Sequence, residues 1–172
     1  AHAGEMEMKY DNSLVAAEAI MTTDTKVKTI AVEFDVDGTT CHIGGICKGS
    51  GMIHPNMGTM LCFITTDCAV SSEMIRKALL FNVKRTFNRV TVDGDTSTND
   101  MCTVLANGMA GNAEITAEGP AYEAFCEALQ AVMQDLARKI AADDEGASKL
   151  MTCTVKGAKD EETAEVLAKS IA

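Results

Sequence analysis

The sequence lacks the basic surface and the long apolar run that would mark several large classes of protein. Lysine and arginine together number 15 against 25 aspartates and glutamates, which gives a formal net charge of −10. Binding to nucleic acid or to an anionic membrane surface needs a basic face, so this composition argues against both partners. No apolar run approaches the roughly 18 residues of a transmembrane helix. We therefore expect a protein that acts without nucleic acid and without a membrane.

The sequence also lacks the cysteine and histidine spacings of a metal site. No CxxC motif occurs, the number of cysteines is odd, and His42 and His54 show no ligand spacing. We expect no metal and no disulfide framework, but reduced and mostly buried thiols in a cytoplasmic protein. No signal-peptide pattern precedes the first expected helix, which agrees with this location. The cysteines lie in apolar segments, at positions 41, 47, 62, 68, 102, 126 and 153.

The remaining composition is that of an ordinary globular chain. Of the 172 residues, 47% are hydrophobic and 23% are charged, which is enough to build one sizeable core and one domain. The chain begins with AHAGEM, without an initiator methionine, and it ends with AKSIA inside an expected helix. We therefore expect residues 1–172 to be part of a longer protein.

The first half of the chain predicts a helix followed by strands. In residues 28–36 the apolar side chains alternate with polar ones, which is typical of a half-buried strand. Asp37-Gly38 then favours a hairpin turn, with a return strand over residues 39–49. Residues 59–66 are more uniformly apolar, which predicts a central strand. A helix is expected before these strands, at residues 12–21.

The second half predicts mainly helices. Residues 119–146 carry apolar side chains at helical spacing and give the clearest helix of the chain. The other expected elements are a helix at 71–87 capped by Ser71 or Ser72, a strand at 88–94, a helix at 98–108, a strand at 148–157 and a helix at 160–172 opened by Asp160. Together these elements predict an α/β fold in which helices pack on a mixed, largely antiparallel sheet.

Two acidic clusters offer one functional hypothesis. FDVDGTT and VDGDTSTND resemble the signatures of haloacid-dehalogenase phosphatases, in which Asp35 would be the nucleophile and magnesium a cofactor. Three features disagree with that family. The strand before Asp35 alternates instead of being apolar throughout, the turn after it leads to another strand, and the second cluster has a different spacing. A solvated hairpin turn explains Asp35 and Asp37 more simply.

The segment KGSGMIHPNMGTML offers a second hypothesis. It brings small residues directly up to Thr59, which begins the expected central strand. A threonine hydroxyl is a weak nucleophile unless a base lies beside it, and its own α-amine can be that base once the chain is cut before it. The glycine at position 58 permits a strained backbone at such a cut. The residues alone leave open whether Thr59 is a nucleophile or an ordinary strand former.

Longer segments resemble one enzyme family. IMTTDT, GGICKGSGMIHPNMGTMLCFITTD, VTVDGDTSTND and DLARKIAADDEGASK are similar, in this order along almost the whole chain, to the ornithine acetyltransferases of arginine biosynthesis, also called bifunctional glutamate N-acetyltransferases. The resemblance implies a precursor that cleaves itself between Gly58 and Thr59. Residues 1–58 would then end the α chain and residues 59–172 would begin the β chain, within the central part of one domain. Thr59 would be the catalytic nucleophile.

The resemblance also implies the reaction and the binding residues. Acetyl would pass from N-acetylornithine to Thr59 and then to glutamate, and some members of the family also use acetyl-CoA as a donor. By matching motifs, Thr25, Lys48, Thr59 and Glu145 would bind substrate, without a resident cofactor. A lysine suits the carboxylate of an amino acid, and a glutamate suits an amine. We expect the cleaved chains to remain together as α/β pairs in a homo-oligomer.

Two features differ from the family pattern. Most members have alanine where this chain has Gly58. The family's oxyanion hole, a threonine–glycine pair, lies upstream of the segments present here, and its last substrate contacts lie downstream of them. An oxyanion hole commonly contributes about 3–4 kcal/mol to the transition state. A third hypothesis is therefore that the 172 residues alone are a catalytically inactive fragment.

Overall fold

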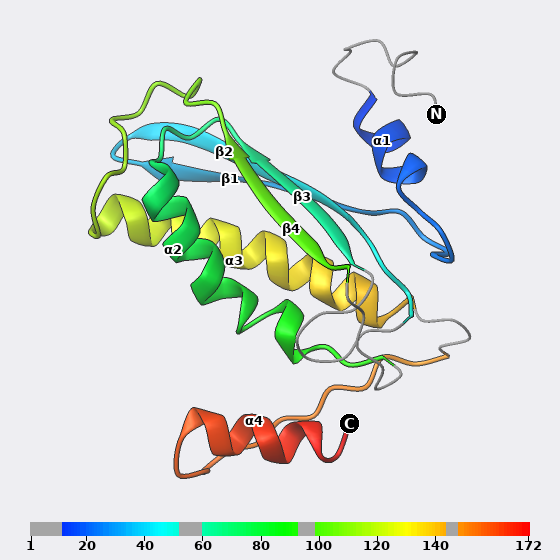
Figure 1. The fold of residues 1–172 in the computed structure, drawn as a ribbon. Helices are drawn as coiled ribbons and strands as arrows, with labels where there is room; N and C mark the ends of the chain where they lie inside the picture. Colours follow the sequence, from blue (N-terminus) through cyan, green and yellow to red (C-terminus); the bar gives the residue numbers. More distant parts are fainter. Residues whose placement is uncertain (1–11, 52–59, 93–98, 144–147) are drawn as a thin grey trace.

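A computed structural model of the chain describes residues 12–51, 60–92, 99–143 and 148–172 (Figure 1). Along the chain, one helix is followed by three strands, a second helix, a fourth strand and two further helices. A short 3-10 helix, Phe87–Arg89, follows the second α-helix. The elements are α1 (Ser13–Ala19), β1 (Lys28–Val36), β2 (Thr39–Lys48), β3 (Leu61–Thr66), α2 (Ser72–Val83), β4 (Met101–Ala106), α3 (Pro120–Ala141) and α4 (Glu161–Lys169).

The strands form one mixed sheet in the order β1-β2-β3-β4. β1 and β2 form the predicted hairpin, in which Asp37 and Gly38 both have positive φ values, of 51° and 82°. This is the combination that a two-residue hairpin turn of the primed type requires. β2 pairs antiparallel with β3, and β3 pairs parallel with β4. The predicted mixed, largely antiparallel sheet is confirmed, and β3 is a central strand as expected.

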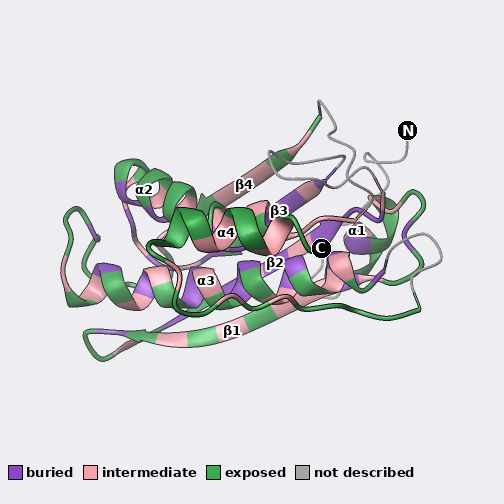
Figure 2. Cartoon of the chain, turned by 90° about the horizontal axis from the view of Figure 1, so that it is seen from below, coloured by how far each residue is buried: buried purple, intermediate pink, exposed green. Residues whose placement is uncertain are grey.

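Two helices cover one side of the sheet. α3 packs on β1 and β2, and α2 packs beside it, so both helices lie on the same side of the strands in Figure 1. Figure 2 shows the buried positions of α3 recurring along the helix between exposed ones. This is the stripe expected from the spacing of its apolar residues. The fully buried members of the stripe include Phe125, Leu129, Val132, Leu136 and Ile140.

Gly45 of β2 allows α3 to lie close to the sheet. A Cβ atom at this position would be 3.0 Å from Leu136 Cδ1 and 3.1 Å from Val132 Cγ1. These distances are shorter than an ordinary carbon–carbon contact, so any side chain larger than hydrogen would push the helix or its side chains away. The glycine therefore serves packing here, since its backbone φ is not in the left-handed region.

Three predicted elements were wrong. Residues 101–106 form strand β4 and not a helix, because they pair with β3 from Leu61↔Met101 to Thr66↔Ala106. Tertiary pairing overrides the helix preference of methionine, leucine and alanine in this segment. Residues 88–92 form no strand, because Asn88 and Arg89 belong to the 3-10 helix and the backbone of 90–92 is irregular. Residues 148–157 have irregular backbone and line a hollow of about 510 Å³ beneath α4.

Two predicted helix caps are confirmed, as is the prediction that most of the cysteines are buried. Ser71 caps α2 by accepting a hydrogen bond from the backbone N–H of Met74 at 3.4 Å, and Asp160 caps α4 by accepting one from Thr163 at 2.8 Å. All seven cysteines are free thiols, and four of them are buried. Among the described residues, no helix has both the length and the hydropathy needed to cross a membrane.

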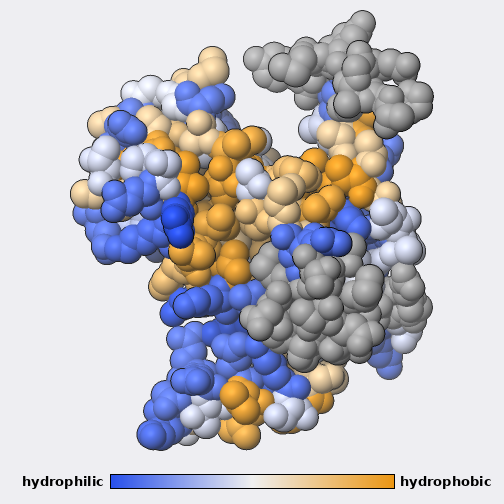
Figure 3. Space-filling view, in the orientation of Figure 1, coloured by the Kyte–Doolittle hydropathy of each residue, from blue (hydrophilic) through white to orange (hydrophobic). Residues whose placement is uncertain are grey.

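Apolar side chains are also exposed on one face. Figure 3 shows them gathered over α2 and the edge strand β4, between more hydrophilic regions. The exposed large apolar residues of these two elements are Leu80, Phe81, Met101 and Leu105. α4 contributes no buried residue, although Val166 and Leu167 lie on it. Apolar surface of this extent commonly marks a contact with further protein.

Candidate active site

One end of the sheet brings together the segments that carry the predicted site residues. Lys28 at the start of β1 pairs with Cys47, next to Lys48 at the end of β2. Lys48 pairs with Leu61 at the start of β3, and Leu61 pairs with Met101 at the start of β4. We call this end of the sheet the Lys48 end. Residues from four strands therefore meet there, although they are far apart in the sequence.

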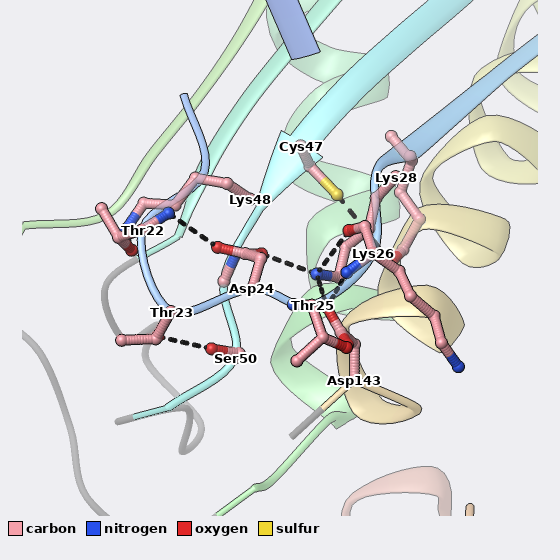
Figure 4. Close-up of polar contacts among 12 residues, drawn as sticks. Thr22, Thr23, Asp24, Thr25, Lys26, Lys28, Cys47, Lys48, Ser50 and Asp143 are labelled. Carbon is pink, nitrogen blue, oxygen red and sulfur yellow. Dashed lines mark hydrogen bonds and ion pairs between the residues drawn. The ribbon is translucent and has the colours of Figure 1, made fainter. Parts of the chain in front are cut away.

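The segment before β1 is hydrogen-bonded to the residues that follow β2 (Figure 4). The Asp24 carboxylate accepts hydrogen bonds from the backbone N–H of Gly49 at 2.7 Å and from that of Thr22 at 3.3 Å. The hydroxyls of Thr23 and Ser50 lie 2.6 Å apart. Two loops without regular structure are thus held together by polar contacts. These contacts fix the position of the backbone that directly follows Lys48.

A buried cluster of Asp24, Lys28 and Asp143, the Lys28 cluster, lies behind these loops. The Lys28 side chain is 1% exposed, and its ammonium lies 2.6 Å from Asp24 Oδ1 and 2.5 Å from Asp143 Oδ2. Burial by itself raises the pKa of a carboxyl group. In Asp24 a backbone hydrogen bond from Gly49 and the Lys28 ammonium outweigh burial, so the pKa of Asp24 is lowered. The cluster joins the start of β1 to the end of α3.

Asp143 connects this cluster to Thr25, one of the predicted substrate-binding residues. The Thr25 hydroxyl donates to Asp143 Oδ1, and the backbone N–H groups of Thr25 and Lys26 donate to Oδ2 at 3.0 and 3.1 Å. Against the effect of burial, the hydrogen bonds from Lys28 and Thr25 lower the pKa of Asp143. Thr25 itself is exposed, so its oxygen retains accepting capacity while its proton is engaged.

Lys48, the second predicted binding residue, is a buried cation with a neutral partner. Its side chain is 5% exposed, and its ammonium donates to the Thr22 hydroxyl at 3.1 Å. A buried ammonium group usually has a carboxylate partner, as Lys28 does. Within the part of the chain that the structure describes, Lys48 makes no ion pair at salt-bridge distance. Its geometry fits a residue that receives a carboxylate from a bound molecule.

Asp100 lies beside the start of β3 and was not among the predicted binding residues. Its Oδ1 accepts a hydrogen bond from the backbone N–H of Met60 at 2.8 Å, and its Oδ2 is buried with no hydrogen-bond partner among the described residues. Burial raises the pKa of Asp100, and the Met60 N–H and the charge of Lys48 oppose that rise in pKa. In the sequence, Asp100 stands out only as a member of an acidic cluster. Its contact with Met60 depends on the pairing of β3 with β4, which local sequence does not show.

The remaining predicted site residues, Gly58, Thr59 and Glu145, lie outside the described residues. Two described residues at the ends of these segments, Met60 and Asp143, lie at the Lys48 end of the sheet. Met60 directly follows Thr59 and contacts Asp100. Asp143 lies two positions before Glu145 and belongs to the Lys28 cluster. One described residue next to each of these two segments therefore lies at this end of the sheet.

Asp35, which would be the nucleophile under the phosphatase hypothesis, lies near the turn of the β1–β2 hairpin. This turn is at the opposite end of the two strands from Lys48. Asp35 is exposed, and its Oδ1 accepts the backbone N–H of Gly38 at 2.9 Å, as expected for a residue that shapes a turn. The described residues contain no group of three or more carboxylate, cysteine or histidine side chains that could hold a metal ion. The contacts of Asp35 support the turn interpretation and not a nucleophile.

Comparison with known proteins decides the family. The model of the ArgJ family matches residues 2–172. The chain belongs to the ArgJ family. This match confirms the family resemblance drawn from the sequence and leaves the phosphatase hypothesis without support. The fold agrees, since the crystal structure of the arginine biosynthesis bifunctional protein argJ from Bacillus halodurans superimposes with a TM-score of 0.61 at 47% sequence identity, over 63% of this chain and 51% of that one.

Curated ArgJ relatives are longer than this chain. It is 54% identical over 153 residues to the arginine biosynthesis bifunctional protein ArgJ of Geobacillus stearothermophilus, covering 89% of this chain and 37% of that protein. It is 52% identical over 155 residues to the protein of the same name from Lactococcus lactis, covering 90% of this chain and 39% of that protein. The chain thus spans about two fifths of the length of these ArgJ relatives.

Sequence reasoning missed the Lys28 cluster, although one signal for it was present. Lys28 has the same strand phase as Ile30, Val32 and Phe34, which form the apolar face of β1. A charged residue in that phase is expected to be buried and to need a partner. The partner, Asp143, is 115 positions away in the chain, so no local pattern could identify it.

Proposed function

We propose that the full gene product containing this chain is an acetyltransferase that moves an acetyl group from N-acetyl-L-ornithine to L-glutamate. The observation that carries the proposal is the buried ammonium of Lys48, whose hydrogen-bond partner among the described residues is a neutral hydroxyl, at the end of the strand that pairs with β3. Such a site suits the carboxylate of an amino-acid substrate. The names of the relatives, bifunctional proteins of arginine biosynthesis, support this substrate class.

The reaction would proceed through an acetyl-threonine intermediate. The Thr59 oxygen attacks the acetyl carbonyl of N-acetylornithine while its proton passes to a base, and the carbon–nitrogen bond breaks as ornithine leaves with that proton. The amine of glutamate then attacks the acetyl ester, which releases the Thr59 oxygen and gives N-acetylglutamate. Splitting one acyl transfer into two steps lets both amino acids use the same site in turn. Acetyl-CoA is an alternative donor for the first step.

Self-cleavage would supply the base. In the precursor, the Thr59 hydroxyl would attack the Gly58 carbonyl. The amide bond between Gly58 and the Thr59 nitrogen would then be replaced by an ester bond to the Thr59 oxygen, and water would hydrolyse that ester. The products are an α chain that ends at Gly58 and a β chain that begins with Thr59. The freed α-amine of Thr59 then takes the hydroxyl proton in each acetyl transfer. Substrate would be held by Lys48 at its carboxylate, by Glu145 at an amine and by Thr25.

The cleaved chains are proposed to stay together as α/β pairs in a homo-oligomer in the cytoplasm. Seven free thiols fit a reducing compartment. The exposed apolar residues of α2 and β4, and the exposed face of α4, are surface that further protein could cover. Because the chain spans about two fifths of its relatives, we expect the 172 residues alone to transfer acetyl poorly or not at all.

Trapping the intermediate tests the proposal. The full gene product is incubated with N-acetylornithine in the absence of glutamate, and the β chain is weighed by mass spectrometry. We expect it to gain the mass of one acetyl group on Thr59 and to lose that mass when glutamate is added. A Thr65→Ala variant is a matched control, since Thr65 is an exposed threonine of β3. Transfer without any acetylated chain would contradict the threonine mechanism.

A further inference from the structure

The two carboxylate oxygens of Asp143 hold Thr25 at both its backbone and its side chain (Figure 4). Oδ2 accepts from the Lys28 ammonium at 2.5 Å and from the backbone N–H groups of Thr25 and Lys26 at 3.0 and 3.1 Å. Oδ1 accepts the hydroxyl proton of Thr25. Asp143 itself is buried, two positions after the end of α3. Three donors therefore meet at one of its oxygens, and the Thr25 hydroxyl is the donor at the other.

This arrangement decides what the Thr25 hydroxyl can still bind. A hydroxyl has one proton to donate and two lone pairs that can accept. Against the effect of burial, the hydrogen bonds from Lys28 and Thr25 lower the pKa of Asp143, so its carboxylate is ionised at neutral pH and can only accept. The Thr25 proton is therefore held by Asp143, and Thr25 offers a bound molecule only its lone pairs. Because Thr25 is exposed, an N–H group of such a molecule can approach them.

We propose that Asp143 is a positioning residue that makes Thr25 a hydrogen-bond acceptor for an N–H group of the amino-acid substrate. This inference rests on the proposed function, in which Thr25 contacts substrate. The ammonium of Lys48, at the same end of the sheet, can only donate, and it suits the carboxylate of that substrate. A threonine that only accepts and a lysine that only donates together match the nitrogen and the carboxylate of an amino acid.

An asparagine at position 143 would reverse what Thr25 offers. The two oxygens of a carboxylate are equivalent, but an amide has one oxygen that accepts and one nitrogen that donates. The amide oxygen would take the place of Oδ2, because three donors meet there. The amide nitrogen would then donate to the Thr25 oxygen, which uses a lone pair and frees the hydroxyl proton. Asp143→Asn thus keeps the shape of the contact and inverts its polarity.

Steady-state kinetics of the full gene product with N-acetylornithine and glutamate test this role. The variants are Asp143→Asn, Thr25→Val, which keeps the shape of the side chain without its hydroxyl, and the two combined. Thr65→Val is the matched control, since Thr65 is an exposed threonine near the other end of β3 from the Lys48 end. Asp24→Asn controls for lost charge in the cluster, because it changes the other carboxylate beside the Lys28 ammonium.

We expect Asp143→Asn and Thr25→Val each to raise KM for N-acetylornithine about threefold to tenfold with kcat nearly unchanged, as for the loss of one hydrogen bond to substrate. Asp143→Asn should change KM by less than about twofold in the Thr25→Val background, because it acts through the Thr25 hydroxyl. Asp24→Asn combined with Thr25→Val should instead give the product of their separate effects. Thr65→Val should keep wild-type kinetics.

Two results would overturn the inference while the proposed function stands. One is a fall in kcat with unchanged KM in Asp143→Asn, which indicates a loss of folded protein alone. The other is that Asp143→Asn and Thr25→Val raise KM independently. If Asp143→Asn does not fold or does not mature, the Thr25 variants decide: an unchanged KM in Thr25→Val overturns the inference, and a raised KM that Thr25→Ser restores supports it. If the wild-type protein transfers no acetyl, the proposed function fails and the inference with it.

Discussion

Replacing Lys28 by methionine should destabilise the protein strongly. The change keeps the length of the side chain but removes an ammonium group that is 1% exposed and lies between two carboxylates, at 2.6 and 2.5 Å. Removing one partner of a buried ion pair leaves uncompensated charge and typically costs about 3–5 kcal/mol. Backbone N–H groups from Gly49 and Thr25 still donate to the two carboxylates, so we expect the lower half of this range.

The effect can be measured by urea denaturation of the full gene product at neutral pH. We expect a lower transition midpoint with an unchanged slope, which indicates a change of stability and not of the unfolded state. Lys26→Met is the matched control, because Lys26 is an exposed lysine in the same segment and its contacts to the cluster come from the backbone. The control should change stability by less than about 0.5 kcal/mol.

The pH dependence gives an independent check. In the wild-type protein the pKa values of Asp24 and Asp143 are lowered. Their pairing therefore stabilises the fold above the pKa of the unfolded carboxyls, and this stability is lost as pH falls through the folded pKa values. When Lys28 is absent, burial should instead raise the pKa values of Asp24 and Asp143. The difference in unfolding free energy between wild type and Lys28→Met should therefore shrink as the pH falls. A variant as stable as wild type at pH 7 would refute the reasoning.

Three further predictions follow from other contacts. Gly45→Ala should lower stability by about 1–3 kcal/mol in thermal denaturation, because its Cβ would lie 3.0 Å from Leu136; an unchanged Tm would contradict the close packing. Lys48→Met should raise KM for N-acetylornithine at least about tenfold with a smaller change in kcat, and an unchanged KM in steady-state kinetics would remove its binding role. The hydrogen bond that the His42 ring donates to the Asp67 carboxylate raises the pKa of His42, so NMR titration should place that pKa above its usual value, and Asp67→Asn should lower it.

Local patterns predicted the elements whose signals are local. The alternation in β1 and the helical stripe of α3 both reflect one buried face, and both were found where expected. β4 was predicted as a helix because its sequence, MCTVLA, contains good helix formers, and only the edge of β3 makes it a strand. Residues 148–157 were likewise predicted from their own sequence alone, as a strand. Their backbone does not pair in a sheet, and apolar side chains of the segment line a hollow instead.

The candidate site shows the same division between local and distant information. Lys48 and Thr25 were singled out by resemblance, and the structure places both at the Lys48 end of the sheet. Asp143 and Asp100 were not identified as site residues, because their importance lies in contacts with residues 115 and 40 positions away. Sequence reasoning can recognise a motif, but it cannot show which distant side chains hold that motif in place.

Intact mass spectrometry of the full gene product, beside its Thr59→Ala and Thr65→Ala variants, tests the central claim most directly. We expect the wild type and Thr65→Ala to give two fragments whose masses sum to the precursor plus one water, with the break between Gly58 and Thr59. Thr59→Ala should remain one chain. A wild-type protein that stays uncut, or a Thr59→Ala variant that is cut at the same bond, would contradict the amino-terminal threonine mechanism.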